Sequence, residues 1–189
     1  MKRWIVWSCL SIILLNNGAA VRADSGPFQL SLVAPLQVVA PEHSVTGLRL
    51  NLLYGRNTHM SGLDIGLFNV TTGTFAGHGA GLFNYAGREV YGTHEGVVNW
   101  ARYDVHGAQA GFINVVGSHV AGGQFGVINY TGSVEGLQLG LYNRAIDAAG
   151  IQIGVLNITQ HLTGMQIGLL NVVSGRQQFR AVPIVNLAW

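Results

Sequence analysis

The sequence has little charge, one cysteine and one lysine, and these shortages exclude several classes of protein. Cys9 and Lys2 both lie near the start of the chain, so the remainder has no disulfide and no thiolate that could hold a metal. Charged residues make up 10% of the chain, and the formal net charge is +2. A surface so poor in charge lacks the basic patch that nucleic acid binding requires, and we expect no nucleic acid partner.

The first residues have the pattern of a secretory signal peptide. Met1-Lys2-Arg3 supplies positive charge, an apolar run follows from Trp4 to Leu15, and Val21-Arg22-Ala23 offers a cleavage site. The apolar run is too short to span a bilayer, which requires about 20 residues. We therefore predict an exported protein of the outer membrane or cell surface, with the periplasm as an alternative.

Long apolar runs are absent beyond this leader, and a short repeat takes their place. An asparagine recurs every fourteen or fifteen residues, with one glycine seven residues before it and a second glycine three residues before it. The unit G-x-Q-x-G-x-x-N is clearest from Gly136 to Asn143, and a divergent copy from Gly47 to Tyr54 has tyrosine in the asparagine position. Such regularity predicts a repeat architecture. The repeated asparagines are Asn69, Asn84, Asn99, Asn114, Asn129, Asn143, Asn157, Asn171 and Asn186.

Two architectures accommodate this repeat. In an all-β solenoid of 14–15-residue coils, equivalent residues stack about 4.8 Å apart and the asparagines form a structural ladder. In an antiparallel meander each unit is one strand, and the strands close into a small outer-membrane β-barrel. The asparagine stays at the same end of every unit, which favours the solenoid. The alternating C-terminal segment that ends in Trp189 favours the barrel, which stays the alternative.

The repeats divide the chain into four segments. We expect the signal peptide at 1–23, an N-terminal strand or cap at 24–46, the repeats at 47–175, and a C-terminal strand or cap at 176–189. Caps are needed because the open ends of a solenoid would otherwise pair with other strands.

Strand alternation places the aliphatic and the polar residues of each unit on opposite faces. Glutamine recurs at one position of five consecutive units, and aromatic residues follow several asparagines at the same parity. These residues are Gln109, Gln124, Gln138, Gln152 and Gln166, with Tyr85, Trp100 and Tyr130. They are a candidate surface for an envelope glycan, a lipid or a protein. The alternative is that the glutamines form a structural ladder and the aromatic residues belong to the core or to a membrane interface.

One pair of units interrupts the pattern with residues capable of chemistry. His78, Thr93, His94 and Glu95 fall in neighbouring units, and Glu95 occupies a position that is aliphatic in the regular copies. A carboxylate beside histidines could act in acid–base catalysis or bind a metal. The alternative is a local opening of the apolar stripe to water. Because the chain has no HExxH spacing and its seven histidines fall at different repeat positions, we predict no enzyme, no metal and no cofactor.

The units Gly136–Asn143, Gly150–Asn157 and Gly164–Asn171 resemble those of bacterial surface-repeat-containing proteins, in which copies of G-L-Q-[IL]-G-[LV]-x-N follow a signal peptide. The segments Thr46–Gly55 and Pro183–Asn186 are similar to the start and the end of that family's repeats. The resemblance implies an envelope or surface location and supplies no catalytic residues. With the repeat, it leads us to expect an exported structural or adhesive protein of the cell envelope without catalytic activity. The alternative function, tied to the alternative fold, is a minor channel or a structural barrel of the outer membrane.

Overall fold

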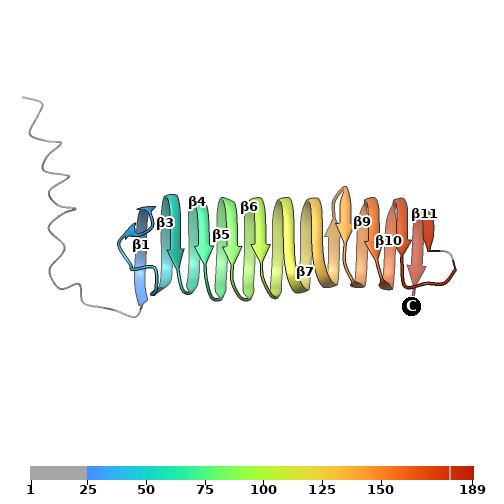
Figure 1. Ribbon diagram of the computed structural model, residues 1–189, viewed down its shortest axis with the longest axis horizontal. Helices are drawn as coiled ribbons and strands as arrows, with labels where there is room; N and C mark the ends of the chain where they lie inside the picture. Colours follow the sequence, from blue (N-terminus) through green and yellow to red (C-terminus); the bar gives the residue numbers. More distant parts are fainter. Residues whose placement is uncertain (1–24, 179) are drawn as a thin grey trace, which may run out of the picture.

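The repeats form a straight stack of coils, a β-solenoid (Figure 1). The computed structural model describes residues 25–178 and 180–189, and the predicted signal peptide lies outside them. One sheet runs through the stack in the order β11-β10-β9-β8-β7-β6-β5-β4-β3-β1-β2. Its strands are β1 (Ser25–Val33), β2 (Leu36–Gln37), β3 (Ser44–Asn57), β4 (Met60–Thr71), β5 (Phe75–Ala86), β6 (Val90–Ala101), β7 (Val105–Leu139), β8 (Tyr142–Arg144), β9 (Asp147–Thr159), β10 (His161–Val173) and β11 (Ala181–Ala188).

Successive repeats pair in parallel, with equivalent residues opposite one another. Asn84 of β5 lies opposite Asn99 of β6, and Gln138 of β7 lies opposite Gln152 of β9. The predicted solenoid is therefore confirmed. The antiparallel meander closed into a barrel is wrong, because neighbouring repeats run in the same direction. The alternative function that depended on a barrel falls with it.

Two glycines shape each coil, for different reasons. The leading glycines have φ values between 122° and 138°, a region that residues with a side chain rarely adopt. The second glycine lies where the chain turns a corner. A Cβ added to Gly126 would clash with the carbonyl oxygen of Gly111 and with the side-chain amide of Asn114. The repeat therefore requires glycine at both positions for neighbouring coils to stack closely.

Four positions of each coil point into the interior, counted from the leading glycine as position 0. Position −2 holds an aliphatic or aromatic residue such as Val105, and position +9 holds a residue such as Ala101 or Thr131. Positions +2 and +7 are mostly glutamine and asparagine, which are buried. The core is thus half amide, and this is stable because parallel stacking brings a hydrogen-bond partner to each amide.

Antiparallel strands cover both ends of the stack. At the N-terminal end β1 pairs in parallel with β3 and in antiparallel with β2. At the other end β11 pairs in antiparallel with β10. β1 and β2 fall within the segment expected as an N-terminal cap, and β11 falls within the segment expected as a C-terminal cap.

Candidate functional site

The repeated asparagines form a buried ladder through the stack. Each Nδ2 from Asn69 to Asn157 donates to Oδ1 of the next asparagine at 2.8–2.9 Å. The same amide also donates to a backbone carbonyl of the next coil, as Asn143 does to Ile153 at 2.8 Å. The ladder contains Asn69, Asn84, Asn99, Asn114, Asn129, Asn143, Asn157 and Asn171. Both protons of nearly every rung are therefore satisfied inside the protein.

The prediction from the repeat spacing was wrong at both ends of this ladder. Asn186 lies on the antiparallel strand β11 opposite Gln166, and its Nδ2 donates to Oε1 of Gln166 at 3.2 Å. Asn186 therefore ends the glutamine column, because the chain reverses direction before β11. In the divergent first copy, Gly55 and not Tyr54 lies opposite Asn69. The Asn51 side chain fills the space beside Gly55 and donates to Asn69 at 2.9 Å, adding the first rung.

The five glutamines lie inside the coil, so the hypothesis of a glutamine surface is wrong. Gln109, Gln124, Gln138, Gln152 and Gln166 are each 0% exposed. Each Nε2 from Gln124 onward donates to Oε1 of the preceding glutamine, at 2.5–3.3 Å. They form the structural ladder of the alternative hypothesis. Because these side chains are buried and bond to one another, they are not available to a partner at the surface.

The aromatic residues do not share a face with the glutamines. Trp100 is 46% exposed and Tyr130 is 39% exposed, and Tyr85 is half-buried. All three occupy position +8, on the outside of the coil. The chain turns a corner between positions +2 and +7, and the alternation of inward and outward side chains changes phase there. Positions +2 and +8 are both even in the sequence, but +2 points inward and +8 points outward.

Toward the N-terminus, the column at +2 changes from glutamine to other residues. Arg49 Nε donates to Oδ1 of Asp64 at 2.8 Å, and the two buried side chains form an ion pair. Gly79 follows, and its missing side chain leaves room for His94, whose ring lies 4.5 Å from that of Phe75. Burial, with smaller contributions from the positive charges of Arg49 and His78, lowers the pKa of His94 to about 3.

His94 also interrupts the hydrogen bonds of the glutamine column. Within residues 25–178 and 180–189, Nδ1 of His94 and Nε2 of Gln109 have no hydrogen-bond partner. The glutamine ladder is directional, because each Nε2 donates toward the N-terminus, and at position 94 it meets an imidazole in place of an amide oxygen. The column therefore ends there with an unsatisfied donor.

The structure does not bring together the four residues of the predicted chemical site, His78, Thr93, His94 and Glu95. His94 points into the core, whereas His78 and Thr93 lie on the outer surface, where His78 Nδ1 is 2.5 Å from Thr93 Oγ1. Glu95 is exposed at position +3. Among the described residues, no group of three or more His, Cys, Asp or Glu side chains is arranged to hold a metal. The expectation that all histidines occupy different positions is wrong in part, because His59, His119 and His161 share position −3 in coils that are not adjacent.

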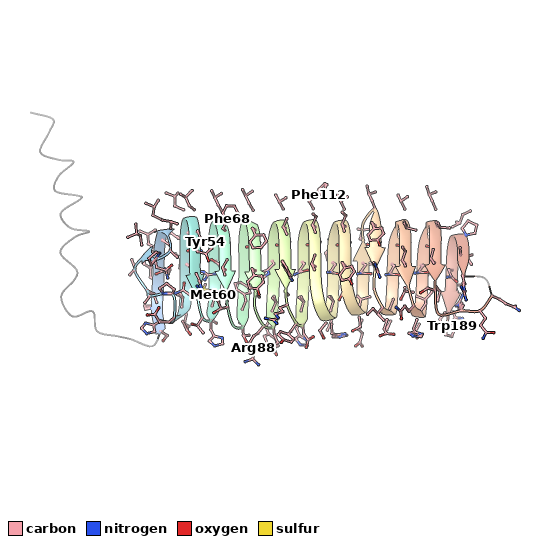
Figure 2. All side chains as sticks on the ribbon, in the orientation of Figure 1. Tyr54, Met60, Phe68, Arg88, Phe112 and Trp189 are labelled. Atoms are coloured by element: carbon pink, nitrogen blue, oxygen red, sulfur yellow. The ribbon has the colours of Figure 1, made fainter. Side chains whose placement is uncertain are left out.

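The outer surface along one long margin of the solenoid is apolar. We call the row at position +5 the apolar edge. Figure 2 shows Phe112 of this row at one margin of the stack and Arg88 at the opposite margin. Most residues of the edge are at least 39% exposed. The apolar edge consists of Leu67, Leu82, Val97, Phe112, Val127, Leu141, Val155 and Leu169.

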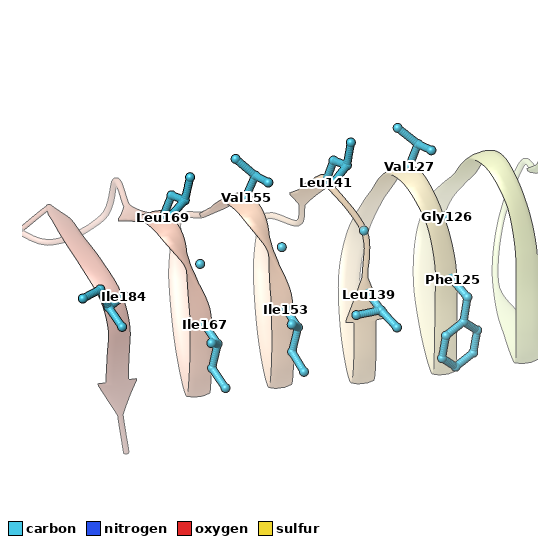
Figure 3. Close-up of a pocket in the computed structure, with 13 residues that line it drawn as sticks. Phe125, Gly126, Val127, Leu139, Leu141, Ile153, Val155, Ile167, Leu169 and Ile184 are labelled. Atoms are coloured by element: carbon cyan, nitrogen blue, oxygen red, sulfur yellow. The ribbon is translucent and has the colours of Figure 1, made fainter.

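A groove runs beside the apolar edge. Its floor is the row of glycines at +4, and its walls are the side chains at +3 and +5 (Figure 3). Between Phe125 and Ile184 the groove has a volume of about 680 Å³. A second section of about 560 Å³ lies between Leu30 and Leu82. Glu95, the charged residue of the +3 wall, lies between these two sections.

Charge is segregated to the opposite margin, which we call the polar edge. It is formed by the turns between coils and carries Arg88, Glu89, Arg102, Asp104 and Asp147. In the eight coils from Gly62 to Val172, only Glu95 and Arg144 are charged among the outer positions +3, +5, +6 and +8. The other residues at these positions are aliphatic or aromatic. The solenoid is therefore amphipathic across its width, with a polar core between the two margins.

Comparison of the chain with protein-family models, with curated proteins and with solved structures finds no match. No helix in the described part of the chain has the length and hydrophobicity to cross a membrane. The candidate site is therefore the apolar edge with its groove, chosen on geometry and chemistry.

Proposed function

We propose that this chain is an exported structural protein of the bacterial cell envelope, without catalytic activity, that binds a lipid layer through its apolar edge. One observation carries the proposal: the exposed row at +5 is aliphatic or aromatic in every coil from Gly62 to Val172, whereas the opposite margin consists mostly of polar and charged residues. Exposed apolar patches larger than a few hundred Å² mark interaction sites in soluble proteins. A patch continuous over all coils reaches that size.

The energetics favour an apolar partner for this margin. Fully burying one Leu or Val side chain contributes about 1.5–3 kcal/mol. Leu141 is 58% exposed and Leu169 is 73% exposed, so most of that contribution is still to be gained. A glycan would need polar groups beside the aromatic rings, yet the neighbouring row at +6 is aliphatic or aromatic, from Phe68 to Leu170. Lipid is therefore the better partner for this surface.

The leader and the repeat family support the envelope location. The first 23 residues have the pattern of a signal peptide, and the repeat units resemble those of surface-repeat-containing proteins. We expect N-terminal sequencing of the protein from the envelope fraction to begin near Asp24, with cleavage after Ala20 as the alternative. Recovery of a cytosolic protein that begins at Met1 would contradict export.

Vesicle flotation tests lipid binding. The protein should float with vesicles of phosphatidylethanolamine and phosphatidylglycerol. A triple variant of the apolar edge, Leu141→Asn with Val155→Asn and Leu169→Asn, should lower the partition coefficient about ten-fold or more, because each substitution removes apolar area from the contact. The matched control places three asparagines on the polar edge of the same coils, with Asp147→Asn, Gln160→Asn and Ser174→Asn.

The two triple variants distinguish binding through the apolar edge from non-specific association with vesicles. The control should float as well as the unchanged protein. Equal flotation of both variants, or no flotation of the unchanged protein, contradicts the proposal.

A further inference from the structure

The side of the coil next to the apolar edge carries an aromatic and cationic row at position +8, which we call the interfacial row. Its aromatic and cationic members are Arg56 of the first coil, Tyr85, Trp100, Tyr130 and Arg144, and its other members are Val70, Val115, Ile158 and Val172. Tyr85 and Trp100 pack edge to face, with ring centroids 5.8 Å apart. The Arg144 guanidinium lies 5.5 Å from the centroid of the Tyr130 ring. These side chains combine an apolar body with a polar tip, the combination that occurs at membrane–water interfaces.

The distance between the two rows matches the depth of a protein that lies in one leaflet. Positions +5 and +8 are three residues apart, which corresponds to about 10 Å of extended chain. Surface-bound amphipathic elements bury their apolar side about 5–10 Å into the boundary between headgroups and acyl chains. With the apolar edge at that depth, the interfacial row lies at the level of the headgroups.

The charges of this row complement lipid headgroups. From Arg56 to Val172 the row has two arginines and no acidic residue. Both arginines are exposed, and they lie toward the two ends of the stack. A guanidinium at headgroup level can form charge-assisted hydrogen bonds with phosphate oxygens. Arg56 and Arg144 are thus at the depth of the lipid phosphates.

A second copy of the chain covers this surface less well than lipid does. The apolar edge is the outside of a corner, so two edges would touch over positions +3 to +6 alone. That strip is about 10 Å wide and about 45 Å long, or about 450 Å², roughly half of the ~800 Å² per partner in a stable dimer. Acyl chains deform around a ridge and cover both of its sides.

We propose, on the basis of the lipid binding proposed above, that the solenoid lies along one leaflet of a phospholipid bilayer with its axis in the membrane plane. The apolar edge enters the acyl chains, the interfacial row lies among the headgroups, and the polar edge stays in water. The whole length of the stack contacts the membrane at once, because the coils are arranged in a straight line (Figure 1).

Depth-dependent quenching of tryptophan fluorescence tests this orientation. Trp4→Phe, Trp7→Phe and Trp189→Phe leave Trp100 as the single reporter on the interfacial row. Replacing Trp100 by Phe and adding Leu141→Trp or Gln160→Trp moves the reporter to the apolar edge or to the polar edge. The vesicles are phosphatidylethanolamine and phosphatidylglycerol with brominated phosphatidylcholine, labelled either close to the headgroup or at the middle of the acyl chain.

The expected pattern has three levels. The reporter at position 141 should be quenched most by mid-chain bromine, Trp100 most by bromine close to the headgroup, and the reporter at position 160 by neither. Vesicle flotation with equal quenching at the three positions, or with quenching at position 160, overturns the orientation and leaves lipid binding standing. Failure of every reporter protein to float overturns both proposals.

Discussion

The coils from Gly47 to His106 and those from Gly107 to Val173 share one ladder and differ in the other. The asparagine ladder passes through both regions with hydrogen bonds of the same length. The column at +2 is uniformly glutamine in the C-terminal coils, but in the N-terminal coils it is Arg49, Asp64, Gly79 and His94 in succession. The difference teaches that glycine and asparagine specify the coil, whereas position +2 accepts an amide ladder, an ion pair, a glycine or an imidazole.

The glutamine ladder and the Arg49–Asp64 pair differ in how much stability they lose when one residue is substituted. An amide ladder spreads its hydrogen bonds over many equivalent rungs, and the loss of one rung leaves two neutral groups without partners. The Arg49–Asp64 pair concentrates two buried charges in a single contact. A buried ion pair is strongly destabilised when one partner is removed, because the other charge stays in the interior.

The largest effect is expected for Asp64→Ala. It leaves the buried Arg49 guanidinium without its carboxylate and should lower the free energy of unfolding by about 3–5 kcal/mol. Gln138→Ala, the matched change in the C-terminal coils, should lower it by about 1–3 kcal/mol. Chemical denaturation followed by circular dichroism measures both.

A double variant separates charge from position in the same experiment. Arg49→Gln combined with Asp64→Gln replaces the ion pair by two neutral amides and should restore most of the lost stability, since it removes both charges together. Equal losses for Asp64→Ala and Gln138→Ala would break the comparison between the two regions.

Asparagine variants should show no difference between the regions. Asn84→Ala and Asn143→Ala each remove one rung and leave the neighbouring asparagines without a donor or an acceptor, so each should lower stability by about 1–3 kcal/mol. Ser133→Ala on the polar edge is the control, and because Ser133 Oγ has one partly buried hydrogen bond, with Nδ1 of His119, it should change stability by about 1 kcal/mol or less. Negligible and equal melting-temperature shifts for all three would count against the ladder.

His94→Gln should make the N-terminal coils resemble the C-terminal ones. Its Oε1 can accept the hydrogen bond that Nε2 of Gln109 lacks within the described chain, which predicts a gain of about 1 kcal/mol at neutral pH. The pKa of His94 is lowered from 6.5 to about 3 in the folded state. The unfolded chain therefore takes up a proton as the pH falls below about 6.5 while the folded chain does not, and stability decreases between these values.

The pH dependence distinguishes this prediction from a general gain in packing. Urea denaturation at several pH values should show a smaller loss of stability toward acid for His94→Gln than for the unchanged protein. An identical pH dependence in both proteins would show that His94 does not titrate as its burial requires.

The smallest effect on the fold is expected for Glu95→Gln. Glu95 is exposed and lies between the two sections of the groove, so its substitution should leave the melting temperature unchanged. Removing a charge from the lipid-facing side should raise vesicle partition several-fold. A loss of bound metal or of a measurable activity in this variant would instead revive the hypothesis of a chemical site.

The sequence predicted the architecture because its strongest signal is directional. An asparagine at the same end of every unit fits parallel stacking, and this was sufficient to prefer the solenoid. The spacing of Asn186 also fits, but spacing cannot show that the chain reverses before β11. The first coil likewise contains an extra residue, so that Gly55 lies at the position where the spacing had placed Tyr54.

The candidate site was harder to predict, because the repeat reverses the usual distribution of polar and apolar residues. Amides are mostly exposed in globular proteins, and leucine is mostly buried. Strand alternation correctly separated Gln138 from Leu139, but only stacking shows that Gln138 has amide partners above and below it. Once those partners exist, burial of glutamine is favourable and the leucines are left outside.

Thiol labelling tests most directly that the apolar edge meets lipid and the polar edge meets water. In a Cys9→Ser background, Leu141→Cys and Ser118→Cys each provide one exposed thiol, the first on the apolar edge and the second on the polar edge. Both should react rapidly with a water-soluble maleimide in solution. With phosphatidylethanolamine and phosphatidylglycerol vesicles, labelling at position 141 should slow at least ten-fold while labelling at position 118 stays unchanged. Equal labelling rates at position 141 with and without vesicles would contradict the account.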